Sequence, residues 1–115
     1  MNSPILEVRF FANTGGTEPV RDWLRSLPAA DRRTIGEDIK TVQFGWPLGM
    51  PLVRKLDKDL WEIRIHLPDR IVRVLFTVMG NVMVLLHGFV KKSQATLQNE
   101  LNVAKGRLKQ IKNAP

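Results

Sequence analysis

The sequence predicts a single α+β domain with a small antiparallel β-sheet, an N-terminal αα-hairpin and a C-terminal helix. Three observations support this prediction. The chain has 115 residues, which is the size of one domain, so we expect residues 1–115 to form one unit. Short alternating runs separated by tight turns fill residues 52–92, as in an antiparallel sheet. Amphipathic stretches precede and follow those runs rather than separating them, which favours α+β over α/β.

The N-terminal part is predicted to form one strand and two helices. An alternating pattern over Leu6–Phe11 indicates the strand, and a glycine-containing turn cluster ends it. Pro19 suits the first position of a helix, and Pro28 breaks that helix. A second helix is expected over Ala29–Phe44, with Gly45 as its stop. The apolar stripes of the two helices are Val20, Trp23, Leu24 and Leu27, then Ile35, Ile39 and Val42.

The C-terminal part is predicted to form four strands and one helix. The expected strands are Leu52–Leu56, Leu60–Leu67, Ile71–Val78 and Val82–Lys92. The last helix is expected over Leu97–Ile111, capped by Ser93 or Thr96. Its apolar face would contain Leu97, Leu101, Ala104, Leu108 and Ile111.

Positive charges interrupt the apolar strands and are expected on neighbouring strands. Alternation places Glu62, Arg64 and His66 opposite the apolar face that starts with Trp61. It places Arg73 on the face of Ile71, Leu75 and Thr77. It places His87 and Lys91 on the face of Met83, Leu85 and Phe89. Cations on adjacent strands of one small sheet predict a basic pocket that suits a phosphate.

The charge is concentrated in the half of the chain that contains these strands. The net charge is +7. Residues 1–53 carry six bases and six acids, whereas residues 54–115 carry twelve bases and five acids. This asymmetry indicates a polyanionic partner, and the alternative is a solvated basic surface that aids solubility.

The composition excludes several classes of protein and site. The chain has no cysteine, which excludes disulfides, thiol nucleophiles and thiolate metal sites. Two histidines alone do not make a convincing zinc site, so we expect no metal and no cofactor. No apolar run spans a bilayer and no secretory signal precedes the domain, so we expect a cytoplasmic protein without a membrane partner.

The candidate phosphate-binding and catalytic residues are Arg64, Arg73, Lys91 and Lys92, because guanidinium and ammonium groups stabilise charge on a phosphate under attack. The alternative for Arg64 is a structural ion pair with Glu62 or another acid. His66 is a candidate for proton transfer, with His87 or Glu62 as alternatives. His87 has the further alternative of a hydrogen bond inside the core. Additional candidate RNA-binding residues are Arg54, Lys55, Arg70, Lys105 and Trp46, the last as a stacking platform in its loop.

An ordered set of motifs resembles the phage-derived, HigB-like branch of the RelE/ParE toxin superfamily. The motifs are L-W-E-I-R from Leu60, R-V-L-F from Arg73, H-G-F-V-K-K from His87 and E-L-x-x-A from Glu100. The resemblance covers nearly the whole chain. One difference is Leu97, where this branch usually has a proline after the threonine that opens the last helix. Another is the complete absence of tyrosine, which the better-studied enzymes often use at their site.

The resemblance implies the toxin of a type II toxin–antitoxin pair. Such toxins are typically ribosome-dependent mRNA endonucleases that use the adjacent ribose 2′-OH and need no metal. The implied partners are mRNA, the ribosome and a cognate HigA-like helix-turn-helix antitoxin. The matching cations are Arg64, Arg73, Lys91 and Lys92, and His66 occupies a position where the superfamily often has another basic group. Two rival hypotheses are a ParE-like inhibitor of DNA gyrase and an inactive relative that acts only as an antitoxin partner or co-repressor.

Overall fold

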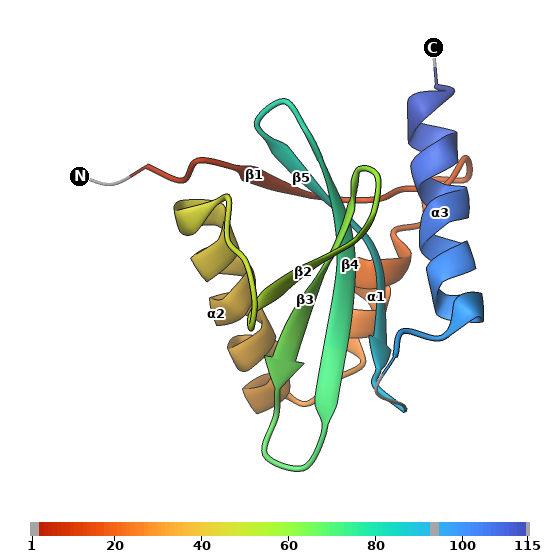
Figure 1. The fold of residues 1–115 in the computed structure, drawn as a ribbon. Helices are drawn as coiled ribbons and strands as arrows, with labels where there is room; N and C mark the ends of the chain where they lie inside the picture. Colours follow the sequence, from red (N-terminus) through yellow and green to blue (C-terminus); the bar gives the residue numbers. More distant parts are fainter. Residues whose placement is uncertain (1–2, 93–94, 115) are drawn as a thin grey trace.

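A computed structural model describes residues 3–92 and 95–114 of the chain, with a five-stranded sheet and three helices (Figure 1). The strands are β1 (Glu7–Phe10), β2 (Val53–Asp57), β3 (Leu60–His66), β4 (Ile71–Met79) and β5 (Val82–Val90). The helices are α1 (Pro19–Arg25), α2 (Ala29–Gly45) and α3 (Gln98–Lys112). The predicted α+β class, helix pair and C-terminal helix are confirmed. Among the described residues, no helix combines the length and apolar character needed to cross a membrane.

The sheet is mixed rather than purely antiparallel. Its strand order is β1-β5-β4-β3-β2, and β2 to β5 pair antiparallel with their neighbours in sequence. The exception is β1, which pairs parallel to β5. The chain leaves β1 at one edge, passes through α1 and α2, and re-enters the sheet at the opposite edge as β2. A tight turn between two strands requires antiparallel pairing, and no such turn joins β1 to β5. These two strands can therefore pair in parallel.

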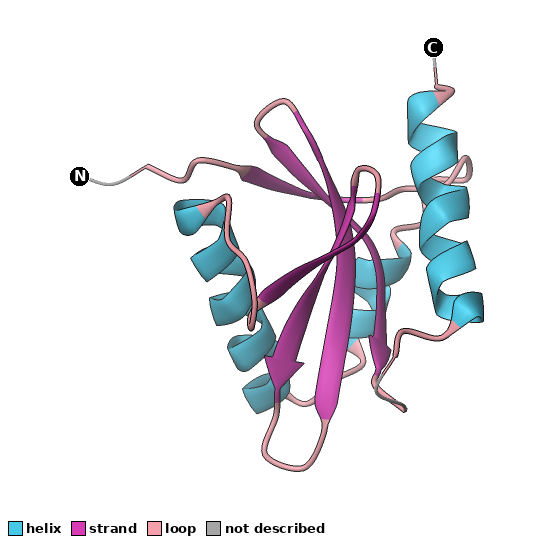
Figure 2. Ribbon diagram, viewed as in Figure 1, coloured by secondary structure: helices cyan, strands magenta, loops and turns pink. Residues whose placement is uncertain are grey.

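Helices cover both sides of the sheet, and each side has its own core (Figure 2). On one side, α1 and α2 supply Val20, Ile35, Ile39 and Val42 to a core with the odd-numbered residues of β3. On the other side, α3 packs its buried Ala104 and Leu108 against Leu60, Leu75 and Leu86. Each fully buried aliphatic side chain stabilises the fold by about 1.5–3 kcal/mol relative to exposure. The helices thus separate the sheet into an α1/α2 face and an α3 face.

A β-bulge in β5 changes the predicted orientation of its second half. Leu85 pairs with Phe76, but His87 pairs with Leu75, so Leu86 is an extra residue between them. Met83 and Leu85 therefore belong to the core of the α1/α2 face. Leu86 belongs to the core of the α3 face, and His87 contacts α3 there. The expectation that His87 shares a face with Met83 and Leu85 was wrong, because a bulge inserts one residue and reverses the alternation beyond it.

The start of α3 also differs from the prediction. The residue before the helix is Leu97, and among the described residues no side chain caps the helix by a hydrogen bond. The hydroxyl of Thr96 instead donates to Glu62 of β3. The capping role expected of Thr96 was therefore wrong, because a buried carboxylate is its hydrogen-bond acceptor. The alternative cap, Ser93, lies outside the described residues. β5 ends at Val90, so the expected strand over Val82–Lys92 was two residues too long and leaves Lys91 and Lys92 in the connection to α3.

Close contact between α1 and β5 at Gly88 yields a stability prediction. A Cβ at Gly88 would lie 2.3 Å from Cζ3 of Trp23, a separation that real side chains do not tolerate. Gly88→Ala should therefore lower the free energy of unfolding by about 1–3 kcal/mol, measured by urea denaturation. The matched control is Gly106→Ala in α3, where no described atom beyond the chain neighbours and the helix's own backbone lies within 4 Å of the added carbon. That change should raise stability by up to about 1 kcal/mol. Equal stability of Gly88→Ala and the parent chain would contradict the close contact between α1 and β5.

Candidate functional site

The centre of the α3 face holds a fully buried carboxylate. Glu62 has no exposed surface, although it lies in the middle of β3. Its Oε2 accepts a hydrogen bond of 2.6 Å from the Thr96 hydroxyl. Arg54 Nη2 lies 3.3 Å from its Oε1, and Arg73 Nη1 lies 3.7 Å from its Oε2. A buried charge is tolerated only when it is paired and hydrogen-bonded, and two guanidinium groups and a hydroxyl meet that requirement here.

The Thr96 hydroxyl connects the segment before α3 to two strands and to the carboxylate. It accepts hydrogen bonds from Arg73 Nη1 at 2.8 Å and from Arg54 Nη2 at 3.4 Å. It donates its own proton to Glu62. A hydroxyl has one donor and two acceptor sites, so this network uses its whole capacity. The approach of α3 to the sheet is thereby fixed through one side chain.

Three arginines, Arg54, Arg64 and Arg73, form a cluster on β2, β3 and β4 that we call the arginine cluster. Arg64 and Arg73 are direct cross-strand partners. Burial lowers the pKa of the Arg73 guanidinium, Glu62 opposes that effect, and the charges of Arg54 and Arg64 add to it. Arginine nonetheless keeps its charge in proteins. The alternative that Arg64 forms the ion pair of Glu62 does not match the structure, in which Arg54 and Arg73 do so.

The arginine cluster carries more positive charge than the buried carboxylate neutralises. Like charges directly opposite one another in a sheet are destabilising, which applies to Arg64 and Arg73. Among the described residues, Nε of Arg64 is buried and has no hydrogen-bond acceptor. One carboxylate, that of Glu62, pairs with two of the three guanidinium groups, those of Arg54 and Arg73. A bound anion would supply the additional negative charge and a hydrogen-bond acceptor for Nε of Arg64.

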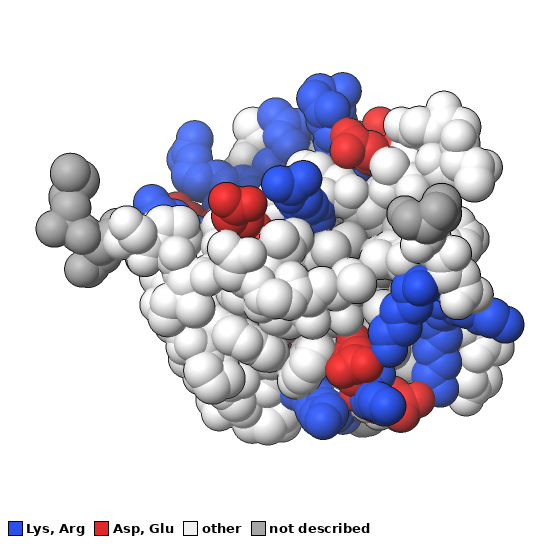
Figure 3. Space-filling view, turned by 90° about the horizontal axis from the view of Figure 1, so that it is seen from above, with Lys and Arg blue, Asp and Glu red and all other residues white. Residues whose placement is uncertain are grey.

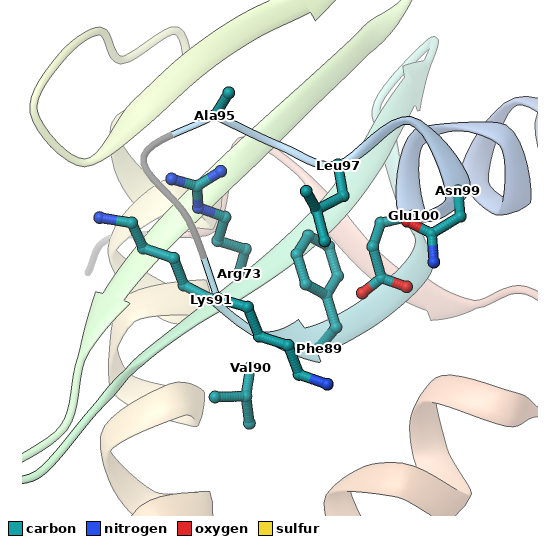
Figure 4. Close-up of a pocket in the computed structure, with 9 residues that line it drawn as sticks. Arg73, Phe89, Val90, Lys91, Ala95, Leu97, Asn99 and Glu100 are labelled. Carbon is teal, nitrogen blue, oxygen red and sulfur yellow. The ribbon is translucent and has the colours of Figure 1, made fainter.

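A cavity of about 80 Å³ opens beside Arg73, between the end of β5 and the first turn of α3. We call it the α3 cavity. In Figure 4 the Phe89 ring lies between Arg73 on one side and Glu100 on the other. The residues that line the cavity are Arg73, Phe89, Val90, Lys91, Lys92, Ala95, Leu97, Asn99 and Glu100. The structure thus brings Arg73, Lys91 and Lys92 to one cavity, with Arg64 adjacent to Arg73.

A histidine–carboxylate pair lies at the α3 side of this cavity. His87 Nε2 is 3.2 Å from Glu100 Oε1, and the imidazole stacks on Phe89 with ring centroids 5.3 Å apart. Both side chains are about four-fifths buried, with 17% and 20% of their surface exposed. Sequence reasoning assigned no role to Glu100, and its place in the E-L-x-x-A motif was the only signal that could have drawn attention to it. The bulge at Leu86 is what turns His87 toward α3.

His66 lies away from the α3 cavity. It is the exposed last residue of β3 and is not among the cavity-lining residues. It interacts electrostatically with Asp38 of α2. Burial and the charge of Glu37 raise the pKa of Asp38, and His66 partly offsets that increase. The structure therefore does not bring His66 together with the arginine cluster.

The residues expected to bind RNA are dispersed over the molecule. Arg54 belongs to the arginine cluster, whereas Arg70 pairs with Asp31 at 2.6 Å and ties the β3–β4 turn to α2. Lys105 pairs with Asp57 at 2.9 Å on the far part of α3.

Trp46 and Lys55 lie over the α1/α2 face. Trp46 packs edge-on to Trp61 at 5.1 Å and to Phe76 at 5.7 Å. Lys55 places its ammonium 5.7 Å from the Trp61 ring. Phe76 is a buried core residue, and the partly buried Trp61 packs against that core. Trp46 is thus part of a packed aromatic cluster rather than an isolated platform in a loop.

The basic charge does not spread as one uniform field. In the view from above in Figure 3, Lys and Arg form separate groups with Asp or Glu among them and an uncharged area between. Ion pairs such as Lys112–Asp59 at 2.7 Å account for part of this mixing. Within residues 3–92 and 95–114, no group of three or more His, Asp or Glu side chains is arranged to hold a metal. The charge that bears on a ligand is therefore local to the arginine cluster and the α3 cavity.

Comparison with known proteins places the chain in a family. The model of the family described as phage-derived protein Gp49-like (DUF891) matches residues 22–109, which is most of the chain. That range contains the whole arginine cluster and every residue that lines the α3 cavity. A search of curated proteins finds no match. The chain therefore belongs to the phage-derived Gp49-like family of the RelE/HigB-like group, a membership consistent with a toxin of a toxin–antitoxin system.

Proposed function

We propose that this protein is the toxin of a type II toxin–antitoxin system and that it cleaves mRNA at the α3 cavity. The observation that carries the proposal is the cross-strand pair of Arg64 and Arg73 beside that cavity. Two guanidinium groups lie on adjacent strands, and among the described residues only the buried one, that of Arg73, pairs with a carboxylate, that of Glu62, which favours an anionic ligand. RNA supplies such an anion at every phosphate.

The proposed chemistry is attack of a ribose 2′-OH on the adjacent phosphate. Negative charge builds up on the non-bridging oxygens during the attack. Preorganised cations stabilise that charge because they need not reorganise as it develops. The planar fork of arginine fits two phosphate oxygens at once, and Arg64 and Arg73 have this role in the proposal. Lys91 and Lys92 would hold the backbone and the leaving 5′-oxygen.

The proposed reaction needs no metal, because arginine and lysine supply the positive charge. The proposed partners are the ribosome, which would present single-stranded mRNA in a fixed conformation, and a HigA-like helix-turn-helix antitoxin encoded nearby. Single-stranded RNA suits the site because its nucleotides can be splayed away from their neighbours. Family membership supports the antitoxin partnership, and the position of the arginine cluster supports the choice of RNA as substrate.

Arg64→Ala should abolish growth arrest on induction, with cleavage reduced on the order of 10²-fold or more. The fold should persist, because Arg64 makes none of the ion pairs that neutralise Glu62. Growth curves at matched expression measure the effect. The control is Arg9→Ala, since Arg9 is 68% exposed on β1, outside the cavity. Full toxicity of Arg64→Ala would contradict the site assignment.

Arg73→Ala should lower stability as well as toxicity. Removing this guanidinium takes away a partner of both Glu62 and Thr96, and breaking a buried ion pair costs about 3–5 kcal/mol. Denaturant unfolding of Arg73→Ala and Arg64→Ala measures the difference. Replacement of both Arg73 and Glu62 by methionine should recover much of the stability, because the buried carboxylate that Arg73 neutralises is also removed. Toxicity should not return, because the Arg73 guanidinium is still missing. An Arg73→Ala protein as stable as its parent would contradict the importance of this pair.

Primer extension on cellular mRNA after induction should reveal new 5′ ends within minutes. The same ends should form from purified ribosomes and mRNA in the Mg²⁺ that intact ribosomes require. They should be absent with Arg64→Ala. Intact mRNA together with a DNA-damage response would instead support the rival hypothesis of gyrase inhibition. Absence of any growth defect would support the inactive relative.

A further inference from the structure

The proposed cleavage needs a group that removes the 2′-OH proton, and His66 is not among the described residues that line the cavity. Among the described residues that line the α3 cavity, Glu100 is the one carboxylate. The lysines there are cationic, and Asn99 does not titrate. A proton acceptor at the cavity is therefore most directly supplied by Glu100.

We propose that Glu100 accepts the 2′-OH proton and that His87 positions and relays for it. This inference rests on the proposed function. His87 Nε2 lies 3.2 Å from Oε1 of Glu100, which leaves Oε2 to act on a ligand in the cavity. The imidazole is itself held by stacking on Phe89. His87 thus fixes the Glu100 carboxylate, and packing on Phe89 fixes His87. A general base is expected to be held in place in this way.

The roles cannot be reversed in this geometry. The side chain of Glu100 lines the cavity, whereas that of His87 does not. The Nε2 atom of His87 is occupied by Glu100. His87 is thus a positioning residue. It can also accept the proton from Glu100, which returns Glu100 to its carboxylate form. Phe89 and Leu97 form the apolar part of the lining and limit the access of water to the pair.

The charged groups around the pair come from three elements. Arg73 lies on β4, Lys91 and Lys92 follow β5, and Arg107 lies on α3 beside His87. Within the described lining of the α3 cavity, three cations, Arg73, Lys91 and Lys92, accompany one carboxylate, that of Glu100, although Arg73 also pairs with Glu62 beneath. An approaching phosphate therefore encounters net positive charge beside one base. The cations hold the phosphate, and Glu100 acts only on the hydroxyl.

The proposed step conserves atoms and electrons. The proton of the 2′-OH passes to Glu100 while the 2′-oxygen forms a bond to phosphorus. The bond from phosphorus to the 5′-oxygen breaks, and that oxygen takes a proton from the ammonium of Lys92. The products are a 2′,3′-cyclic phosphate and a 5′-hydroxyl end. Solvent then restores the proton on Lys92 and removes the one on Glu100 through His87.

The test uses the full chain with purified ribosomes and a defined mRNA, with cleavage rates followed by primer extension. Glu100→Gln should lower the rate by about 10²–10⁴-fold, the usual contribution of a general base. It should also remove the fall in rate at acid pH that protonation of the base causes. Ribosome co-sedimentation and the unfolding midpoint should stay close to the parent values. The matched control is Glu37→Gln, because Glu37 lies on α2, distant from the cavity lining.

The positioning role of His87 is tested by His87→Asn. The rate should fall less than in Glu100→Gln, and the acid limb of the pH profile should shift rather than disappear. A purely structural His87–Glu100 pair would lower stability in both variants and leave the pH profile of the remaining activity unchanged. That result would overturn the inference.

The outcomes separate this inference from the proposed function. Cleavage by Glu100→Gln at the parent rate would overturn the inference and leave the nuclease proposal standing. No cleavage by the unaltered chain would overturn both. If Glu100→Gln fails to fold, Glu100→Asp decides the matter. A reduced rate with the acid limb retained supports the inference, and a parent-like rate overturns it, because the base must reach the hydroxyl.

Discussion

The pairing of Glu62 with its cations is the constraint on which the α3 face depends. A carboxylate without any exposed surface must be neutralised within the protein, and Glu62 lies at the centre of the sheet. Arg54 and Arg73 approach it from the flanking strands, and Thr96 closes the network from the segment before α3. The attachment of α3 and the alignment of three strands are thus parts of one electrostatic arrangement.

The same arrangement prepares the arginine cluster for an anion. Two guanidinium groups bind the carboxylate, and Arg64 stands opposite Arg73 without a carboxylate of its own among the described residues. The cation positions are therefore set by the fold before a ligand arrives. Preorganisation of this kind is valuable in catalysis, since no energy is spent on orienting the groups during the reaction. It also couples stability to function, because Arg73 serves both the buried pair and the cavity.

The regular part of the structure could be predicted from the sequence, and the irregular part could not. Alternation placed Glu62 and Arg64 on one face of β3, and the apolar stripes identified the buried side of α2. The bulge at Leu86 could not be predicted, because the sequence around it is apolar on both faces of the strand. A one-residue shift there leaves the hydrophobic pattern unchanged. The hydrogen bond from Thr96 to Glu62 could not be predicted for another reason. A hydroxyl just before a helix usually serves that helix, and nothing local reveals a buried carboxylate 34 residues away in sequence.

The bulge has a consequence for the candidate site. Without the extra residue, His87 would face the α1/α2 side. On that side the Trp23 ring fills the space that a side chain at the neighbouring Gly88 would need. With the extra residue, His87 and Phe89 both lie on the α3 face, one against Glu100 and the other along the cavity. Bulges commonly re-aim side chains next to active sites. Here a single inserted residue sends the imidazole to the carboxylate of α3 and leaves the glycine for close packing of α1, so one irregularity serves both the core and the cavity.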